Sequence, residues 1–238
     1  MHRHATDVRV YGAHPDQWLR ANGDPAASVC ICFVHGGYWR PRYTAQLMEP
    51  LMDRLTDDPA VATVNIEYRR EGDAEAMQND VRSALRLTRE LFPRAMRVVV
   101  GHSAGGHLAL VTADEVELVV ALAAVTDLTG GYAAGIGSGA VAALLGGSPT
   151  ERPAAYAAAT PRPPAVPALL VHGADDAAVP VSHSRGFARS AEAAGAPVEY
   201  RECAHLDHML LIDPDGPHWP DTWAWVDRHV TDSRKERP

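Results

Sequence analysis

Short apolar runs alternate with helical patterns along most of the chain, and this alternation is the sequence feature that most restricts the fold. The runs have the length of strands and consist mainly of Val, Ile and Leu without a clean polar alternation; they cover residues 28–34, 61–68, 97–100, 116–125, 168–171 and 198–203. Strands of this composition are typically buried on both faces of a parallel sheet. The pattern therefore predicts an α/β architecture with a mostly parallel central sheet and helices on both of its faces.

The remaining segments follow helical or irregular patterns. Residues 73–92 and 43–55 carry apolar stripes at helical spacing. Residues 7–11 resemble a strand without a crossover helix behind it, which predicts an antiparallel start to the sheet. Residues 129–167 contain no clear strand and are rich in Gly, Ala and Pro, so we expect them to leave the sheet as a small cap-like excursion. The short helices expected within it cover residues 139–145 and 152–158.

Length and composition restrict the domain organisation and the partners. A chain of 238 residues with 46% hydrophobic residues can bury a full core, and no linker or repeat divides it, so we expect a single domain over residues 1–238. The formal net charge of −8 provides no basic surface for nucleic acid or for an anionic membrane. Neither a signal peptide nor an apolar stretch of membrane-spanning length is evident, so we expect a cytoplasmic protein. The expected partner is a small-molecule substrate, and a homodimer stays open.

The cysteines do not suggest a metal site or a disulfide framework. Cys30 and Cys32 lie two residues apart in an apolar run, where a strand would point both thiols to one face, and Cys203 stands alone. The pair His205 and His208 has a spacing that a metal could use on a helix, but no acidic or cysteine cluster accompanies it. We therefore expect buried, reduced thiols and neither a metal nor another cofactor.

The strongest local signal is a serine between a predicted strand and a predicted helix. The segment reads Val98-Val99-Val100-Gly101-His102-Ser103-Ala104-Gly105-Gly106-His107-Leu108. In this context G-x-S-x-G is typical of a nucleophile on a sharp turn, whose strained backbone lifts the hydroxyl clear of the sheet. Glycines two positions before and after Ser103 leave room for the turn, and the following helix directs N–H groups toward an anion formed there. An ordinary glycine-containing turn is the alternative.

A second glycine-rich loop follows an earlier predicted strand. It reads Val34-His35-Gly36-Gly37-Tyr38-Trp39-Arg40. Acyl transfer needs hydrogen-bond donors where the oxyanion of the tetrahedral intermediate forms, and the amides of such a loop can supply them. We expect the amides of Gly37, Tyr38 and Ala104 to be these donors. The alternative is a turn whose glycines only permit a positive φ.

A serine nucleophile requires a base, and the base requires a carboxylate that orients it. The loop after residues 168–171 offers Asp175 and Asp176, of which we favour Asp176. His205 and His208, after the last predicted strand, both qualify as the base. Either aspartate also has a simpler interpretation as a helix cap or a solvated loop charge. Serine, aspartate and histidine nevertheless follow one another in the chain order of an α/β hydrolase.

These motifs resemble those of the α/β hydrolases around kynurenine formamidase (arylformamidase) and the hormone-sensitive-lipase-like esterases, and the resemblance extends from Ile31 to the end of the chain. Residues 35–39 are similar to the oxyanion loop of that group and carry the Tyr-Trp pair of its formamidase branch. Residues 207–213 resemble its Asp-His-Phe stretch, which places the base at His208. Met209 stands where the family usually has an aromatic residue.

The resemblance implies the α/β-hydrolase fold and a serine hydrolase of the carboxylesterase or arylformamidase type. The substrate would be a small acyl ester or an N-formyl aryl amide. Ser103 would attack the carbonyl, His208 would act as general base and then general acid, and Asp176 would orient His208. Tyr38 and Trp39 would stack against an aryl or apolar leaving group. A general carboxylesterase and an inactive binding module on the same scaffold are the alternatives.

Overall fold

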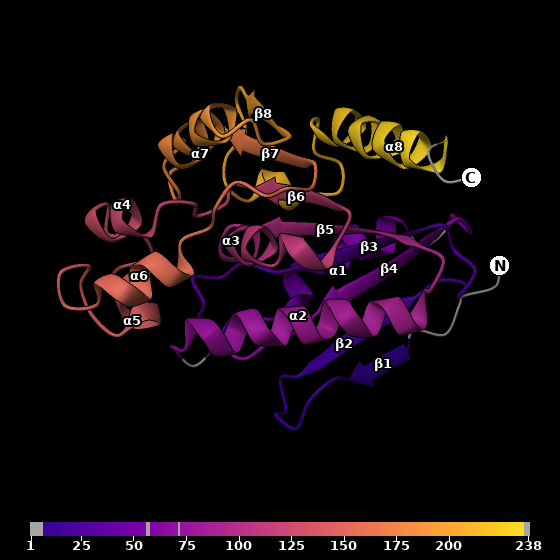
Figure 1. The fold of residues 1–238 in the computed structure, drawn as a ribbon, viewed down its shortest axis with the longest axis horizontal. Helices are drawn as coiled ribbons and strands as arrows, with labels where there is room; N and C mark the ends of the chain where they lie inside the picture. Colours follow the sequence, from indigo (N-terminus) through magenta and orange to yellow (C-terminus); the bar gives the residue numbers. More distant parts are fainter. Residues whose placement is uncertain (1–6, 56–57, 71, 236–238) are drawn as a thin grey trace.

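The strands form one mixed sheet through the centre of the molecule (Figure 1). The structure is a computed structural model that describes residues 7–55, 58–70 and 72–235. The sheet has eight strands in the order β1-β2-β4-β3-β5-β6-β7-β8. The strands are β1 (Asp7–Val10), β2 (Trp18–Asn22), β3 (Val29–Val34), β4 (Val61–Ile66), β5 (Met96–His102), β6 (Leu118–Leu122), β7 (Ala168–Gly173) and β8 (Val198–Cys203).

The pairing directions confirm the predicted, mostly parallel sheet. Every pairing among β3 to β8 is parallel, whereas β1 pairs antiparallel with β2 and β2 pairs antiparallel with β4. The antiparallel start expected at residues 7–11 is therefore correct, but β2 was not predicted. In this short strand the buried Leu19 and Ala21 alternate with the polar Arg20 and Asn22, so it lacks the apolar run on which the strand prediction relied.

Helices cover both faces of the sheet, as the sequence predicted. They are α1 (Glu49–Arg54), α2 (Ala74–Leu91), α3 (Ala104–Val111), α4 (Leu128–Ala133), α5 (Ala140–Leu145), α6 (Pro153–Ala159), α7 (Ser182–Ala193) and α8 (Trp219–Lys235), with the 3-10 helices η1 (Ala45–Met48), η2 (Ala113–Glu115) and η3 (Leu210–Ile212). Helices α2, α3 and α7 cover one face, and α1 and α8 cover the other (Figure 1). No helix in the described ranges is both long enough and apolar enough to cross a membrane.

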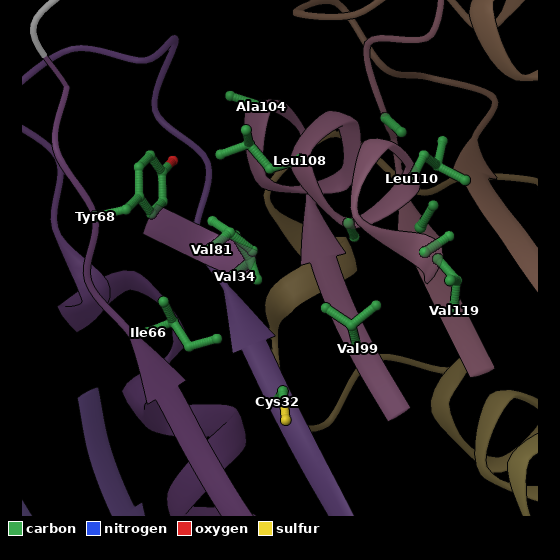
Figure 2. Close-up of a cluster of buried hydrophobic side chains, with 14 of the residues drawn as sticks. Cys32, Val34, Ile66, Tyr68, Val81, Val99, Ala104, Leu108, Leu110 and Val119 are labelled. Atoms are coloured by element: carbon green, nitrogen blue, oxygen red, sulfur yellow. The ribbon is translucent and has the colours of Figure 1, made fainter. Parts of the chain in front are cut away.

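The hydrophobic core is divided by the sheet into two clusters, because successive strand residues point to opposite faces. Figure 2 shows part of the first cluster, in which Val34 lies beside Val81 of α2 and below Leu108 of α3, with Val99 on the neighbouring strand. Members of the second cluster lie on the other face and include Ile31, Phe33, Val98, Val100, Met52, Trp225 and Val230. Both faces of β3 and β5 are thus buried, which explains their continuous apolar composition.

The sequence predicted only one of the two longest helices. In α2 the Asp73 side chain caps the first turn by accepting a hydrogen bond from the Ala76 amide, and Met77, Val81 and Leu85 form its buried stripe. The predicted range of 73–92 agrees with this helix. By contrast, α8 was not predicted. Its buried residues are Trp219, Thr222, Trp225, Val226 and Val230, whose spacing of three, three, one and four is helical and would have revealed it.

The predicted excursion is present as the three short helices α4, α5 and α6. They lie between β6 and β7 in the chain and gather at one side of the molecule (Figure 1). Several hydrogen bonds among the described residues attach this excursion to the rest of the molecule close to the glycine-rich segments. Arg40 donates to the carbonyl oxygen of Gly137, and Nε2 of His107 lies 2.8 Å from that of Ala159. The excursion therefore covers the region where β3 and β5 end.

Candidate active site

Ser103 occupies the turn between β5 and α3. Its φ of 57° and ψ of −117° lie outside the regions that non-glycine residues normally adopt. The turn can form because Gly101 and Gly105 have no side chains. A Cβ at Gly101 would lie 2.2 Å from the carbonyl oxygen of Gly105, and one at Gly105 would lie 2.0 Å from that of Val34. The strand, strained turn and helix expected around Ser103 are therefore all present.

The loop after β3 lies directly against this turn. A Cβ at Gly36 would come within 2.9 Å of the Cβ of Ser103. The next three residues, Gly37, Tyr38 and Trp39, have φ values of 113°, 58° and 56°, so three successive peptide units turn through the left-handed region. The loop thus passes beside the serine in a conformation that only a strongly supported backbone can maintain.

Backbone donors are available on both sides of Ser103. The amides of Gly37 and Tyr38 donate no hydrogen bond within the described ranges, and neither does that of Ala104. Ala104 is the first residue of α3, where amide hydrogens have no partner inside the helix. These amides are the three that the sequence predicted as oxyanion donors.

A buried polar cluster supports the loop from behind, and the sequence did not reveal it. Nε2 of His35 lies 2.9 Å from Oε1 of Glu67, and the Tyr68 hydroxyl donates to the His35 carbonyl oxygen over 2.8 Å. The other carboxylate oxygen of Glu67 accepts the Ala45 amide at 3.0 Å, and Arg70 forms an ion pair with Glu67. Burial lowers the pKa of His35 to about 3. The uncharged His35 and the ion-paired carboxylate of Glu67 therefore hold the start of the loop in place.

The structure brings Asp176 and His208 together. Nδ1 of His208 donates to Oδ2 of Asp176 over 2.7 Å. The other carboxylate oxygen accepts the amides of Ala178 and Val179, each at 2.8 Å. The Asp176 side chain is fully buried, whereas His208 is 12% exposed. The imidazole is therefore oriented by Asp176 and still open to solvent.

The rival pair does not occupy this position. The side chains of Asp175 and His205 are 64% and 95% exposed, and Nδ1 of His205 is 3.9 Å from Oδ2 of Asp175. An exposed pair at this distance is a surface contact worth little energy. Burial and hydrogen bonding thus distinguish Asp176 and His208 from their neighbours, as the sequence interpretation had favoured.

Electrostatics keep the Asp176 carboxyl group ionised. Burial alone would raise its pKa, but hydrogen bonds from His172 and His208 and from the Val179 amide outweigh burial and lower the pKa well below its usual range. The carboxylate can therefore remain charged in a dry environment.

His102 connects His208 to the serine turn. Its Nε2 donates to the His208 carbonyl oxygen over 2.9 Å, and the two imidazole rings lie 4.4 Å apart. Burial, with the neighbouring His208, lowers the pKa of His102 to about 3, so it is an uncharged donor. The contact places His208 beside the residue that precedes Ser103. No hydrogen bond joins the Ser103 hydroxyl to His208 in the part of the chain that the structure describes, and catalytic hydrogen bonds are often incomplete without substrate.

Trp39 does not lie where we expected it. It is 4% exposed, belongs to the hydrophobic core and packs edge-on against His107 with ring centroids 5.4 Å apart. The indole therefore packs in the core against α3, and this burial argues against the stacking surface expected at Trp39. The sequence could not show it, because the burial depends on contacts with α3.

Tyr38 is placed more favourably for substrate. It is partly buried, and a Cβ at Gly137 would lie 2.4 Å from its ring, so the excursion packs on it. Burial, Tyr43 and the Asp176 carboxylate together raise the pKa of Tyr38. Tyr38 therefore packs against the excursion from the loop after β3.

The search for a metal site gives no candidate among the described residues. No group of three or more His, Cys, Asp or Glu side chains in residues 7–55, 58–70 and 72–235 is arranged to hold a metal ion. Cys30 and Cys32 are buried free thiols with sulfur atoms 3.7 Å apart, and Cys203 is half-buried and free. The thiols thus belong to the sheet and not to the site.

Solved structures share this architecture. A truncated carbohydrate esterase from gut microbiota has a TM-score of 0.78 at 17% identity, over 97% of this chain and 99% of its own. A thermophilic esterase from the planctomycete Thermogutta terrifontis has a TM-score of 0.73 at 19% identity, over 95% and 92%. Esterase B from Lactobacillus rhamnosis has a TM-score of 0.74 at 19% identity, over 98% and 88%. The fold is therefore the α/β-hydrolase fold.

Comparisons of sequence lead to the family. No curated protein matches the chain. The family BD-FAE matches residues 16–115, which include β2 to η2. The prolyl oligopeptidase family matches residues 67–233, from the end of β4 into α8, and this range includes Ser103, Asp176 and His208. Because that second match spans more than half of the sequence, the chain belongs to the prolyl oligopeptidase family and is a serine hydrolase.

Proposed function

We propose that the chain is a carboxylesterase that cleaves small acyl esters through an acyl-enzyme on Ser103. The observation that carries the proposal is the strained serine turn beside a loop with free amides and a buried Asp176 that orients His208. Strained backbone of this kind is maintained where function requires it. The hydrogen-bonded pair supplies the base that a serine hydroxyl needs.

In the proposed reaction, Ser103 attacks the ester carbonyl carbon while Nε2 of His208 takes the hydroxyl proton. Nδ1 of His208 already donates to Asp176, so Nε2 is the nitrogen left to act as the base. The carbonyl oxygen becomes negatively charged in the tetrahedral intermediate, and the amides of Gly37, Tyr38 and Ala104 would stabilise that charge. Each such donor typically contributes about 10²- to 10³-fold in kcat.

Collapse of the intermediate would break the bond to the alcohol. His208 returns the proton to the leaving oxygen, which leaves the acyl group on Ser103. Water then attacks the acyl-enzyme with His208 again as general base, and the acid is released. Asp176 stabilises the imidazolium in both halves without taking up the proton. Hydrogen bonds from His208 and from two backbone amides, with Nε2 of His172 3.3 Å away, support this constant ionised state.

The choice of esters over N-formyl aryl amides rests on two observations. The structural neighbours with high TM-scores are described as esterases, which supports ester substrates. The aryl preference was suggested by the pair Tyr38 and Trp39, and the burial of Trp39 removes half of its basis. An arylformamidase of the kynurenine formamidase type is therefore the second candidate, supported by the loop resemblance alone.

One preparation can test both candidates. We expect turnover of p-nitrophenyl acetate and butyrate to exceed that of N-formylkynurenine in kcat/KM, and a fluorophosphonate probe to label the protein. Ser103→Ala should abolish turnover and labelling, whereas Ser190→Ala, at an exposed serine of α7, should change neither. A preference for the formamide would favour the second candidate. Folded protein that is neither labelled nor active would favour a binding module.

A further inference from the structure

A second histidine lies behind the Asp176 carboxylate. His172 is on β7 and fully buried. Its Nδ1 lies 2.7 Å from the Ser184 hydroxyl. Its Nε2 lies 3.0 Å from the Val179 carbonyl oxygen and 3.3 Å from Oδ2 of Asp176. The proposed reaction above assigns nothing to this residue.

The contacts of His172 define which of its nitrogens carries a hydrogen. Both partners of Nε2 are oxygen atoms without hydrogen, a carbonyl and a carboxylate, so Nε2 must be the donor. A neutral imidazole then has an acceptor at Nδ1, and the Ser184 hydroxyl is the donor that fits it. Ser184 is itself fully buried on α7. The hydroxyl therefore selects the tautomer that directs Nε2–H toward Val179 and Asp176.

Oδ2 of Asp176 is consequently shared between two imidazoles. Nδ1 of His208 lies 2.7 Å from it, and Nε2 of His172 lies 3.3 Å from it. Oδ1 is occupied by two backbone amides. A carboxylate oxygen that accepts two hydrogen bonds offers less negative charge to each donor. The strength of the bond to His208 should therefore depend on whether His172 also donates.

We propose that His172 is a positioning residue that holds the Asp176 carboxylate in place and weakens its pairing with the His208 imidazole. This inference rests on the proposed function, in which His208 is the base. A base that is less strongly paired in its protonated form is available over a wider range of pH. His172 acts only through Asp176 and would not contact substrate.

Other charged or titratable groups face this pair from the surrounding elements. They are His102 at the end of β5, Tyr38 in the loop after β3, His183 at the start of α7 with Asp127 beside it, and Glu202 on β8. None of them donates a hydrogen bond to Asp176 among the described residues. These groups remain in place when His172 is substituted. Variants of His172 therefore isolate the effect of its imidazole on the pairing of Asp176 with His208.

Two substitutions of His172 separate the hydrogen bond from the packing. His172→Leu removes the donor and retains much of the volume, whereas His172→Gln places an amide nitrogen close to the position of Nε2. The readout is the titration midpoint of the His208 imidazole, followed by NMR and assigned with His208→Gln. We expect the midpoint to rise by about half a unit or more in the leucine variant, a fraction of the energy of one charged hydrogen bond. The glutamine variant should stay close to wild type.

In the leucine variant, the acid limb of the pH profile of kcat/KM should shift to higher pH together with the titration midpoint. The maximum value of kcat/KM should fall about tenfold, because Asp176 is less firmly held. If His172→Leu does not fold, Ser184→Ala decides: loss of the hydroxyl that selects the tautomer should move the midpoint in the same direction. The proposal is overturned if the titration midpoint is unchanged in the folded leucine variant, or in Ser184→Ala where that variant replaces it. Equal shifts of the midpoint in the leucine and glutamine variants overturn it as well. The NMR titration needs no turnover, so it tests His172 even if the chain hydrolyses no ester.

Discussion

Nε2 of His102 donates a hydrogen bond to the backbone carbonyl oxygen of His208 over 2.9 Å, so the residue immediately before the serine holds the residue proposed as its base. The two belong to distant parts of the chain, since one ends β5 and the other follows β8. We expect His102→Ala to lower kcat by about 10- to 100-fold with little change in KM, because a misplaced base affects the chemical step. Steady-state kinetics would show this. His102→Gln, which can restore the donor, should recover part of the loss; an equal loss in both variants would contradict the positioning role.

The two histidines after β8 should differ strongly in their effect on turnover. His208→Ala should reduce kcat by several orders of magnitude, because the members of a catalytic triad act as a unit. His205→Ala is the matched control, since that side chain is 95% exposed. Its kcat should be within about twofold of wild type, as for most surface substitutions. Kinetics that ranked the two variants in the opposite order would move the base to His205.

The two adjacent aspartates provide a similar comparison. Asp176→Asn should lower kcat by about 10⁴-fold, because the amide can no longer select the productive tautomer of His208 or stabilise its imidazolium. Asp175→Asn should have little effect, since the Asp175 side chain is 64% exposed and lies 3.9 Å from Nδ1 of the exposed His205. Circular dichroism would verify that both variants fold. Similar kcat values for the two variants would show that neither carboxylate orients the base.

The buried Trp39 should contribute to stability rather than to substrate choice. We expect Trp39→Ala to lower the free energy of unfolding by about 3–5 kcal/mol, the usual loss for a large aromatic side chain removed from a core. Any loss of activity should be equal for aryl and alkyl esters. Urea unfolding measures the first effect, with Trp223→Ala, at a half-buried position of α8, as the milder control. A loss confined to aryl esters would restore Trp39 to the substrate pocket.

Buried histidines should make the protein less stable in acid. Burial lowers the pKa of His107 to about 4, whereas an unfolded histidine has a pKa near 6.5. Between these values the unfolded chain binds the additional proton, so stability is lost as the pH falls, by up to about 1.4 kcal/mol per pH unit for one such residue. Urea unfolding at pH 7 and pH 5 would measure the loss. His107→Gln, which can keep the bond to the Ala159 carbonyl, should show a smaller pH dependence than wild type.

The sequence by itself determined the features that depend on local physics. Continuous Val, Ile and Leu runs such as β3 and β5 predicted strands buried on both faces, and the fold followed from their alternation with helices. Gly101 and Gly105 around Ser103 predicted the strained turn, because only residues without a Cβ fit that close backbone approach. The apolar stripe of α2 was sufficient to predict this helix, since residues three and four apart along the chain reveal the helical period.

Only the tertiary structure decided the features that depend on contacts between distant segments. Trp39 turned from an expected substrate contact into a core residue because α3 packs against it. His172 and His102 are ordinary residues in the sequence, and their positions beside Asp176 and His208 arise from the way in which β5, β7 and the loop after β8 meet. Burial and hydrogen-bond partners are properties of that assembly and not of any short segment. These properties determine which histidines of this chain donate a hydrogen bond to a buried carboxylate or carbonyl group.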